Sequence, residues 1–238
     1  MNKNEVKEHF GKQAGSYEEL MVKLIPGYLE QHAIIYDLLP EGEKAYRVLD
    51  LGCGNGVLSE QVLKKYPHAC IIGFDLTEEM LKAYKNKLSK YSNRFELKKG
   101  DFKTESIGDS YDIILAGLSL HHLGLEQRRN FYKTIYSALN AGGTFISRDI
   151  IIDEDEGVRT QQYELWKRFI ESNGEDPEFW YSKHMQKDTP VTLGEHFAWL
   201  KDAGFIKIGC HYRLFILVTQ VRFARVMGTD EWLLGLKG

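Results

Sequence analysis

The sequence predicts an α/β fold in which a doubly wound, mostly parallel sheet carries helices on both faces. Short apolar runs typical of buried strands alternate with segments of helical periodicity from residue 46 to residue 149. Parallel strands have such continuous apolar runs because both faces of their sheet are covered. A glycine-rich turn follows the first run, at the edge of such a sheet where ligands bind.

Residues 1–45 are predicted to form an N-terminal helical cap. Residues 10–17 carry the pattern F-x-x-x-A-x-x-Y, which ends at Tyr17, and a helix is expected over 28–39 before Pro40. Each aromatic residue of this part has packing in a core as its alternative role, since large aromatic side chains are commonly buried.

The first strand and the turn after it carry the clearest ligand signal. Residues 46–56 read Y-R-V-L-D-L-G-C-G-N-G, an apolar run followed by glycines at every second position. The helix expected over 57–66 points its N-terminal N–H groups at this turn, which suits a carboxylate or a phosphate. A dinucleotide fingerprint has glycine at its sixth position, where Val57 stands, so NAD is disfavoured.

Three further apolar runs follow in order. The second, residues 69–74, ends in Asp75, about twenty residues beyond the glycines, where an acid can hold the two hydroxyls of a ribose. The next helix is expected over 77–91 with Thr77 as its N-cap. The third run, 95–99, leads into G-D-F, and the fourth, 111–116, leads into G-L-S-L-H-H-L at 117–123.

These motifs, in this order, resemble the S-adenosylmethionine (SAM) dependent methyltransferases of the seven-stranded Rossmann-like class. The matching stretches are D-L-G-C-G-N-G, G-F-D, G-D-F and L-S-L-H-H-L. The resemblance implies one domain over 1–238 with a seven-stranded sheet, an antiparallel edge strand, a small helical cap or lid, and a SAM-binding core at 46–149. It also implies a small-molecule methyl acceptor. The SAM contacts that it implies are Tyr17, Tyr28, Asp50, Gly52, Cys53, Gly54, Asp75, Leu76, Asp101, Phe102 and Gly117.

Two stretches are similar to one subfamily, the carboxy-SAM synthases and the related tRNA-modifying methyltransferases. They are I-P-G-Y, whose tyrosine touches the cofactor in that subfamily, and D-T-P-V-T-L-G-E-H-F-A-W-L-K-D-A-G-F at 188–205. The subfamily's carboxylate-binding arginine aligns with Trp199, and its asparagine after the fourth strand aligns with Gly117. An indole cannot make the bidentate ion pair of a guanidinium, so ordinary SAM is expected. Trp199 either makes the site near the methyl group apolar or packs in the core.

Methyl transfer mainly requires that the acceptor is held in line with the sulfonium methyl, so a general base is optional. The candidate bases are His122, Asp149 and His184, and each has structural packing as its alternative. No metal site is predicted, because the adjacent His121 and His122 cannot both face one ion from regular structure and no acidic cluster stands beside them. Catechol-type magnesium methyltransferases place an aspartate near Gly117, and this chain has none there.

The rest of the chain is divided into a lid and a C-terminal part. A helix from Leu125 and a fifth strand at 144–149 end the alternation, and residues 150–190 carry an acidic run and a group of aromatics. Their helical spacing predicts a lid helix, whose apolar stripe is either its own core or an aromatic substrate pocket. Residues 191–238 contain a helix that starts at a Thr192–Glu195 capping box, an antiparallel strand pair, and a tail at 224–238 without an assigned place.

Composition limits the classes of function. Three cysteines without metal or disulfide spacing, a polar start and no membrane-spanning apolar run indicate a cytoplasmic protein without a membrane segment. A net charge of -3 without a basic block, and the lack of an N-P-P-Y motif, disfavour nucleic acid as a partner. The open alternatives are a carboxy-SAM synthase and a catalytically silent SAM-binding or oligomerising module, with a homodimer as one oligomeric state.

Overall fold

The computed structural model describes residues 17–224. The predicted pattern at residues 10–16 and most of the tail lie outside this range. The elements in chain order are α2 (Tyr17–Leu24), α3 (Tyr28–Leu38), β1 (Arg47–Leu51), α4 (Val57–Lys65), β2 (Cys70–Asp75), α5 (Glu78–Lys87), η1 (Ser89–Tyr91), β3 (Phe95–Lys99), β4 (Tyr111–Gly117), η2 (Leu120–His122), α6 (Leu125–Ala138), β5 (Leu139–Ile152), α7 (Glu156–Ser172), α8 (Pro177–Lys187), β6 (Val191–Thr192), α9 (Leu193–Ala203), β7 (Ile206–Leu214) and β8 (Leu217–Ala224).

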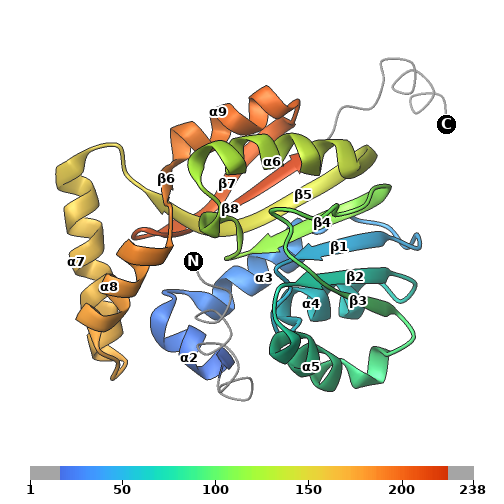
Figure 1. Ribbon diagram of the computed structural model, residues 1–238, viewed down its shortest axis with the longest axis horizontal. Coiled ribbons are helices and arrows are strands. Elements are labelled where there is room, and N and C mark those ends of the chain that lie inside the picture. Colours follow the sequence, from blue (N-terminus) through green and yellow to red (C-terminus); the bar gives the residue numbers. More distant parts are fainter. Residues whose placement is uncertain (1–16, 225–238) are drawn as a thin grey trace.

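The strands form a sheet with the order β3-β2-β1-β4-β5-β8-β7 (Figure 1). Strands β1 to β5 pair in parallel, and the short β6 also pairs with β5 in parallel. The sheet thus has eight strands rather than the predicted seven, because the two-residue β6 gives too short a pattern to recognise. The antiparallel strand is β8, which lies between β5 and β7, so β7 and not β8 forms the edge.

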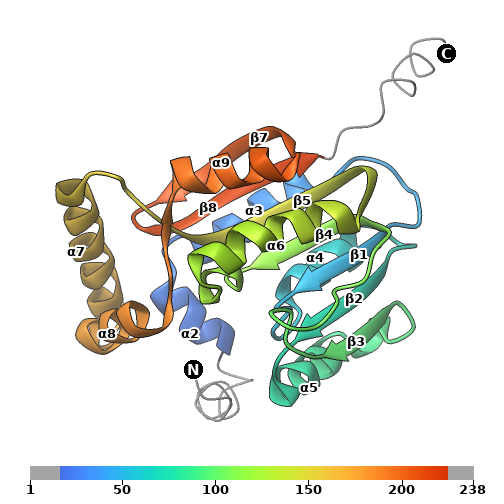
Figure 2. The same ribbon diagram turned by 45° about the horizontal axis from the view of Figure 1, so that its top comes forward.

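Two apolar clusters cover the two faces of the sheet. Along β1, Leu49 and Leu51 face a cluster with α6 and α9, whereas Val48 faces a cluster with α3, α4 and α5. Figures 1 and 2 show these helices on opposite sides of the strands. Side chains of a strand alternate between faces, so a run that is apolar at every position packs against helices on both sides. The predicted doubly wound architecture is therefore confirmed.

A third apolar cluster joins the lid to the N-terminal helices. Tyr163, Trp166 and Ile170 of α7 are buried in it together with Leu24 and other residues, and the Trp166 indole donates a hydrogen bond of 2.9 Å to the Leu24 carbonyl. In Figure 2, α7 and α8 lie beyond the end of β5, next to α2. The aromatic stripe of the lid is thus a packing face shared with the N-terminal helices and not a core made by the lid alone.

The connection between α6 and β5 differs from the prediction. The helix ends at Ala138, and β5 begins at the next residue, so residues 140–143 belong to the strand and are not a helix cap. Leu139 pairs with Tyr111, and the register shifts before Ile113, which accommodates the positive φ of 74° at Gly142. Within residues 17–224, no helix is both long and apolar enough to cross a membrane.

Candidate functional site

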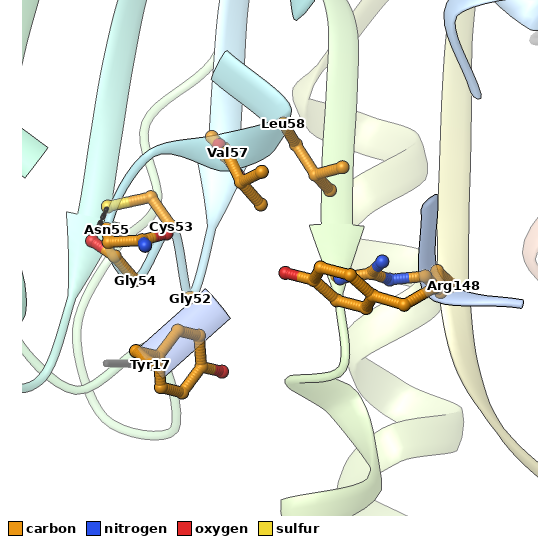
Figure 3. A pocket seen from close by; sticks show the side chains of 11 residues that line it. Tyr17, Gly52, Cys53, Gly54, Asn55, Val57, Leu58 and Arg148 are labelled. Atoms are coloured by element: carbon orange, nitrogen blue, oxygen red, sulfur yellow. Dashed lines mark hydrogen bonds between the residues drawn. The ribbon is translucent and has the colours of Figure 1, made fainter. Parts of the chain in front are cut away.

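The carboxyl ends of the parallel strands border a small cleft that is partly open to solvent. Its walls come from the N-terminal helices, the turn after β1, the end of β4 and the end of β5 (Figure 3). Ligands of doubly wound sheets bind outside the carboxyl ends of the strands, so the cleft occupies the expected place. The lining residues are Tyr17, Tyr28, Asp50, Gly52, Cys53, Gly54, Asn55, Val57, Leu58, Gly117 and Arg148.

Backbone contacts hold the glycine turn in a fixed shape. The Gly52 and Cys53 N–H groups both donate to the Phe74 carbonyl, at 2.8 and 3.1 Å. At Gly52, whose φ is 66°, an added Cβ would lie 2.5 Å from Cβ of Ser119, so only glycine fits. At Gly54, by contrast, an added Cβ would meet nothing within 4 Å. The turn therefore packs tightly against the protein at Gly52 and leaves open space at Gly54.

Asp75 lies at the end of β2 and braces this turn. Its Oδ2 accepts a 2.9 Å hydrogen bond from the Gly54 N–H, and its Oδ1 accepts bonds from the N–H and hydroxyl of Thr77 at 2.9 and 3.1 Å. Burial raises the pKa of the Asp75 carboxyl, although the hydrogen bonds that it accepts act to lower that pKa. These bonds hold the Asp75 carboxylate in place beside the glycine turn.

Asp50, near the end of β1, is a second carboxyl group at the cleft. It is 1% exposed, and its Oδ2 accepts a 2.7 Å hydrogen bond from the Ser59 hydroxyl. Burial raises its pKa to about 6, even though the bonds from Ser59 act in the opposite sense. This group can therefore become a carboxylate beside a positively charged ligand at neutral pH.

Sequence reasoning missed four residues that line the cleft, Asn55, Val57, Leu58 and Arg148, of which Arg148 is the charged one. It is 4% exposed, its Nη1 lies 2.8 Å from His32 Nε2, and its guanidinium lies 4.8 Å from the centroid of the Tyr28 ring. Burial, followed by the Arg148 charge, lowers the pKa of His32 to about 3, so the neutral imidazole accepts this bond. The Arg148 Nε has no hydrogen-bond partner. Among the described residues, no carboxylate pairs with this buried cation.

The sheet register explains why Arg148 reaches the cleft. Arg148 pairs with Gly117, the last residue of β4, so it lies at the level where β4 ends. A Cβ added at Gly117 would lie 2.7 Å from Leu58 Cδ1 but 3.8 Å from Arg148 Nη2, so the glycine leaves room for Leu58, whereas the guanidinium would be in ordinary contact. In Figure 3, Arg148 and Tyr17 approach the space beside the Gly52–Gly54 turn from different sides. The available signal was a charged residue at the end of an apolar strand.

The structure brings most, but not all, of the predicted cofactor residues together. Asp75 contacts the turn directly but, like Leu76, Asp101 and Phe102, it is not among the described residues that line the cleft. Asp101 accepts a bond from the Lys103 N–H, and the Phe102 ring stacks on Phe131 at 5.3 Å between centroids. The adenosine contacts of these three residues stay a prediction. Tyr17, Tyr28, Asp50, Gly52, Cys53, Gly54 and Gly117 line the cleft as predicted.

Trp199 does not line the cleft. Its indole is half-buried and packs against the apolar cluster between the sheet, α6 and α9. That cluster lies on the opposite face of the sheet from α3 and α4. The core-packing alternative for Trp199 therefore fits the structure, and a role beside the methyl group does not.

Asp149 is an internal anchor rather than an exposed base. Its Oδ1 lies 2.5 Å from His121 Nδ1 and accepts a bond from the Ile150 N–H, and its Oδ2 lies 3.5 Å from Arg128 Nη2. Burial favours a higher pKa, but Arg128 and then His121 outweigh it and lower the pKa to about 2. Asp149 is thus an ionised group that holds His121 in place.

The other two candidate bases belong to the same cluster. His184 Nδ1 lies 2.9 Å from Asp188 Oδ2, and the Tyr163 hydroxyl lies 3.1 Å from His184 Nε2, so this histidine is fully engaged. His122 Nδ1 lies 3.2 Å from Asp188 Oδ1, and its ring is partly exposed. Sequence reasoning had not grouped these residues, because Asp188 comes from the lid, far along the chain.

Comparisons with known proteins agree with this geometry. The family pattern described as a methyltransferase domain matches residues 48–143, which lie within the predicted core at 46–149. A carboxy-S-adenosyl-L-methionine synthase of Nautilia profundicola is 24% identical over 217 residues, covering 88% of this chain and 91% of the relative.

Two further matches involve O-methylating and N-acetylserotonin enzymes. The tetracenomycin polyketide synthesis 8-O-methyl transferase of Streptomyces glaucescens is 27% identical over 190 residues, covering 79% of this chain but 48% of the relative. The structure of human N-acetylserotonin methyltransferase with SAM superposes with a TM-score of 0.64 at 16% identity, covering 95% of this chain and 62% of that one. The second match shows that the fold is shared.

Proposed function

We propose that this chain, a SAM-dependent methyltransferase of the carboxy-SAM synthase-like group, transfers the SAM methyl group to a small-molecule acceptor beside Arg148. The observation that carries this proposal is the buried guanidinium of Arg148, which has an unpartnered Nε and faces the cleft. A buried cation without a carboxylate is costly, and the carboxylate of a ligand offsets that cost.

The order of the strands supports one direction for SAM in the cleft. Asp75 ends β2, the Gly52–Gly54 turn follows β1, Gly117 ends β4, and Arg148 lies on β5, the next strand along. A ligand with its ribose on Asp75 therefore passes the glycine turn and brings its methionine part towards Arg148. The open space at Gly54 supports this fit, since no side chain in the described part of the chain occupies it.

Each residue of the cleft then has a defined task. Asp75 accepts from the ribose hydroxyls, Asp50 balances the ammonium group, and Arg148 pairs with the methionine carboxylate. When bound, SAM supplies an activated methyl group on a sulfonium. The protein orients that group towards the acceptor and excludes water, and this positioning contributes several kcal/mol to the rate enhancement.

The carboxy-SAM synthase alternative is favoured by one specific observation, the same Arg148. Trp199 has no part in the cleft, so the cation available for an extra carboxylate is Arg148 on β5. With carboxy-SAM as the ligand, Arg148 would pair with the added carboxylate near the sulfonium. The two functions thus differ in which carboxylate Arg148 meets.

Mass spectrometry of the ligand that copurifies with the protein tests the proposal. SAM or its demethylated product is expected, whereas carboxy-SAM would favour the synthase reading. Purified protein is then incubated with methyl-labelled SAM and a panel of small hydroxylated acceptors, and label on an acceptor is the expected result. A ligand-bound protein that transfers no label to any acceptor would indicate a silent SAM-binding module instead.

The finer predictions remain to be tested separately. The division into a cap, a core, a lid and a C-terminal part, the cytoplasmic location and the homodimer stay predictions. Mass photometry measures the oligomeric state directly, and cell fractionation measures the location.

A further inference from the structure

Three ligand-type atoms converge beside the end of β4, apart from the residues that line the cleft. They are His121 Nε2, His122 Nδ1 and Asp188 Oδ1, which all lie within 4.8 Å of one another. His122 Nδ1 is 3.2 Å from Asp188 Oδ1, and His121 Nε2 is 3.7 Å from the same oxygen. Ligand atoms of a tetrahedral Zn²⁺ site, with bonds of about 2.0–2.1 Å, stand about 3.3 Å apart.

The hydrogen bonds of His121 fix the direction of its lone pair. Its Nδ1 lies 2.5 Å from Asp149 Oδ1, and an ionised carboxylate only accepts, so the Nδ1 proton points at Asp149. In the neutral ring, Nε2 then carries a lone pair, which faces the lone pairs of Asp188 Oδ1. Two facing acceptors repel each other unless a cation or a proton lies between them.

Further groups orient the remaining ligand atoms from behind. His184 Nδ1 and Asp188 Oδ2 are 2.9 Å apart, and the Tyr163 hydroxyl contacts the other nitrogen of His184. A carboxylate behind a ligating histidine and a supported ligating carboxylate are the arrangement that surrounds many protein metal sites.

The fold also explains how adjacent histidines reach one point. They lie in η2, a short 3-10 turn that follows the positive φ of 56° at Leu118, so they are outside regular helix or strand geometry. The Thr189 N–H donates to the His121 carbonyl at 2.8 Å, which ties the lid residue Asp188 to this turn. The premise that two neighbouring histidines cannot face one ion does not hold here.

We propose that His121, His122 and Asp188 bind a divalent metal ion of the Zn²⁺ type. Imidazole nitrogens and one carboxylate suit Zn²⁺ and related transition metals. Three protein ligands leave one position of a four-coordinate ion open. The site would serve as a Lewis acid beside the carboxyl ends of β4 and β5.

A consequence for the substrate rests on the proposed methyltransferase function. An acceptor hydroxyl that occupies the open position loses its proton to solvent more easily, and its oxygen attacks the methyl carbon as the carbon–sulfur bond breaks. The sulfonium becomes a neutral thioether, and the metal keeps its charge. The acceptor class is therefore a hydroxylated small molecule.

Calorimetric titration of the chelator-treated full chain with Zn²⁺ tests the site, and Co²⁺ serves as a spectroscopic probe. We expect one ion per chain and a visible Co²⁺ spectrum without thiolate bands, since no cysteine belongs to the site. Loss of a group that only supports a metal ligand costs ~10–100-fold in metal affinity. His122→Ala removes a ligand itself, so it should weaken Zn²⁺ binding by ~100-fold or more. Asp149→Asn should weaken it by ~10–100-fold through His121.

His68→Ala is the matched control, because His68 is an exposed histidine outside the three-residue site and all cysteines remain. Equal Zn²⁺ affinity in wild type, His122→Ala and His68→Ala would overturn the proposal. So would nitrogen NMR that shows a doubly protonated His121 unchanged by added Zn²⁺. Calorimetric titration of the chelator-treated protein with SAM separates the two proposals. If this protein binds Zn²⁺ but does not bind SAM, the methyltransferase proposal is refuted and the metal-site proposal is not.

Discussion

Replacing Arg148 by methionine separates a ligand-binding arginine from a structural one. Methionine keeps an unbranched side chain of similar length in a cleft wall, but it removes the charge and the hydrogen-bond donors. The wild-type guanidinium gives one bond to His32 Nε2 and stacks on the Tyr28 ring. Its Nε has no hydrogen-bond partner among residues 17–224, so the part of the guanidinium around Nε is left for a ligand carboxylate.

The expected effect on binding is large, whereas the effect on stability is small. Charge-assisted hydrogen bonds contribute about 1.5–3 kcal/mol each, so losing two of them weakens SAM binding by about 3 kcal/mol or more, roughly 100-fold. Among the described residues no carboxylate pairs with Arg148, so folding loses the His32 bond and the Tyr28 contact while the buried charge is removed. Arg148→Met should therefore unfold close to the wild-type temperature.

Calorimetry with SAM and with decarboxylated SAM provides the test. Wild type should bind SAM far more tightly than the decarboxylated compound, and Arg148→Met should bind the two about equally. Arg47→Met is the control, since Arg47 also lies over a tyrosine ring, at 5.0 Å from the Tyr111 centroid, but is exposed and outside the cleft lining. If Arg148→Met keeps the wild-type SAM affinity, or loses affinity equally for both compounds, the assignment of Arg148 is refuted.

Three further predictions concern the other cleft carboxyl groups and the buried histidines. Asp75→Asn should weaken SAM binding by ~10–100-fold in calorimetry, whereas the exposed control Asp109→Asn should leave it unchanged; equal losses in both would contradict the ribose assignment. The pKa of Asp50 is raised to about 6, so its carboxylate form predominates above that pH. SAM affinity should therefore rise ~10-fold from pH 5 to pH 7. If the same rise persists in Asp50→Asn, Asp50 is not the group that causes it. Burial lowers the folded-state pKa of His32 and His196 to about 3, so below the histidine pKa of the unfolded chain, about 6.5, the unfolded chain binds more protons than the folded one. The urea concentration at the unfolding midpoint should therefore fall as the pH drops from 6.5 towards 3, although the raised pKa of Asp50 partly offsets this fall. His196→Gln should make the dependence of the midpoint on pH less steep.

Local sequence signals were sufficient for the glycine turn and Asp75. The positions of Gly52 and Gly54 follow from a strand that must turn sharply beneath a ligand, and Asp75 ends the next apolar run. The alternation of strands and helices likewise predicted the layers, because each apolar run had to be covered on both faces. These features depend on neighbours in sequence, so they were predictable.

Arg148 and the His121–Asp188 contact depend on register and on the placement of the lid. Arg148 reaches the cleft because it pairs with Gly117 across two strands, a relation that no local pattern of either strand contains. Asp188 meets His121 because a backbone bond from Thr189 docks the lid on η2. The predicted role of Trp199 beside the methyl group came from its alignment with an arginine of the carboxy-SAM synthases. Its packing is decided instead by the face of α9 on which it lies, and this face contacts the apolar core.

The orientation of the cofactor is the central claim, and a crystal structure of this chain with S-adenosylhomocysteine tests it most directly. The account predicts ribose hydroxyls within hydrogen-bond distance of the Asp75 carboxylate and the methionine carboxylate paired with the Arg148 guanidinium. A ligand whose carboxylate lies away from Arg148, with the guanidinium still bonded to His32 alone, would contradict it.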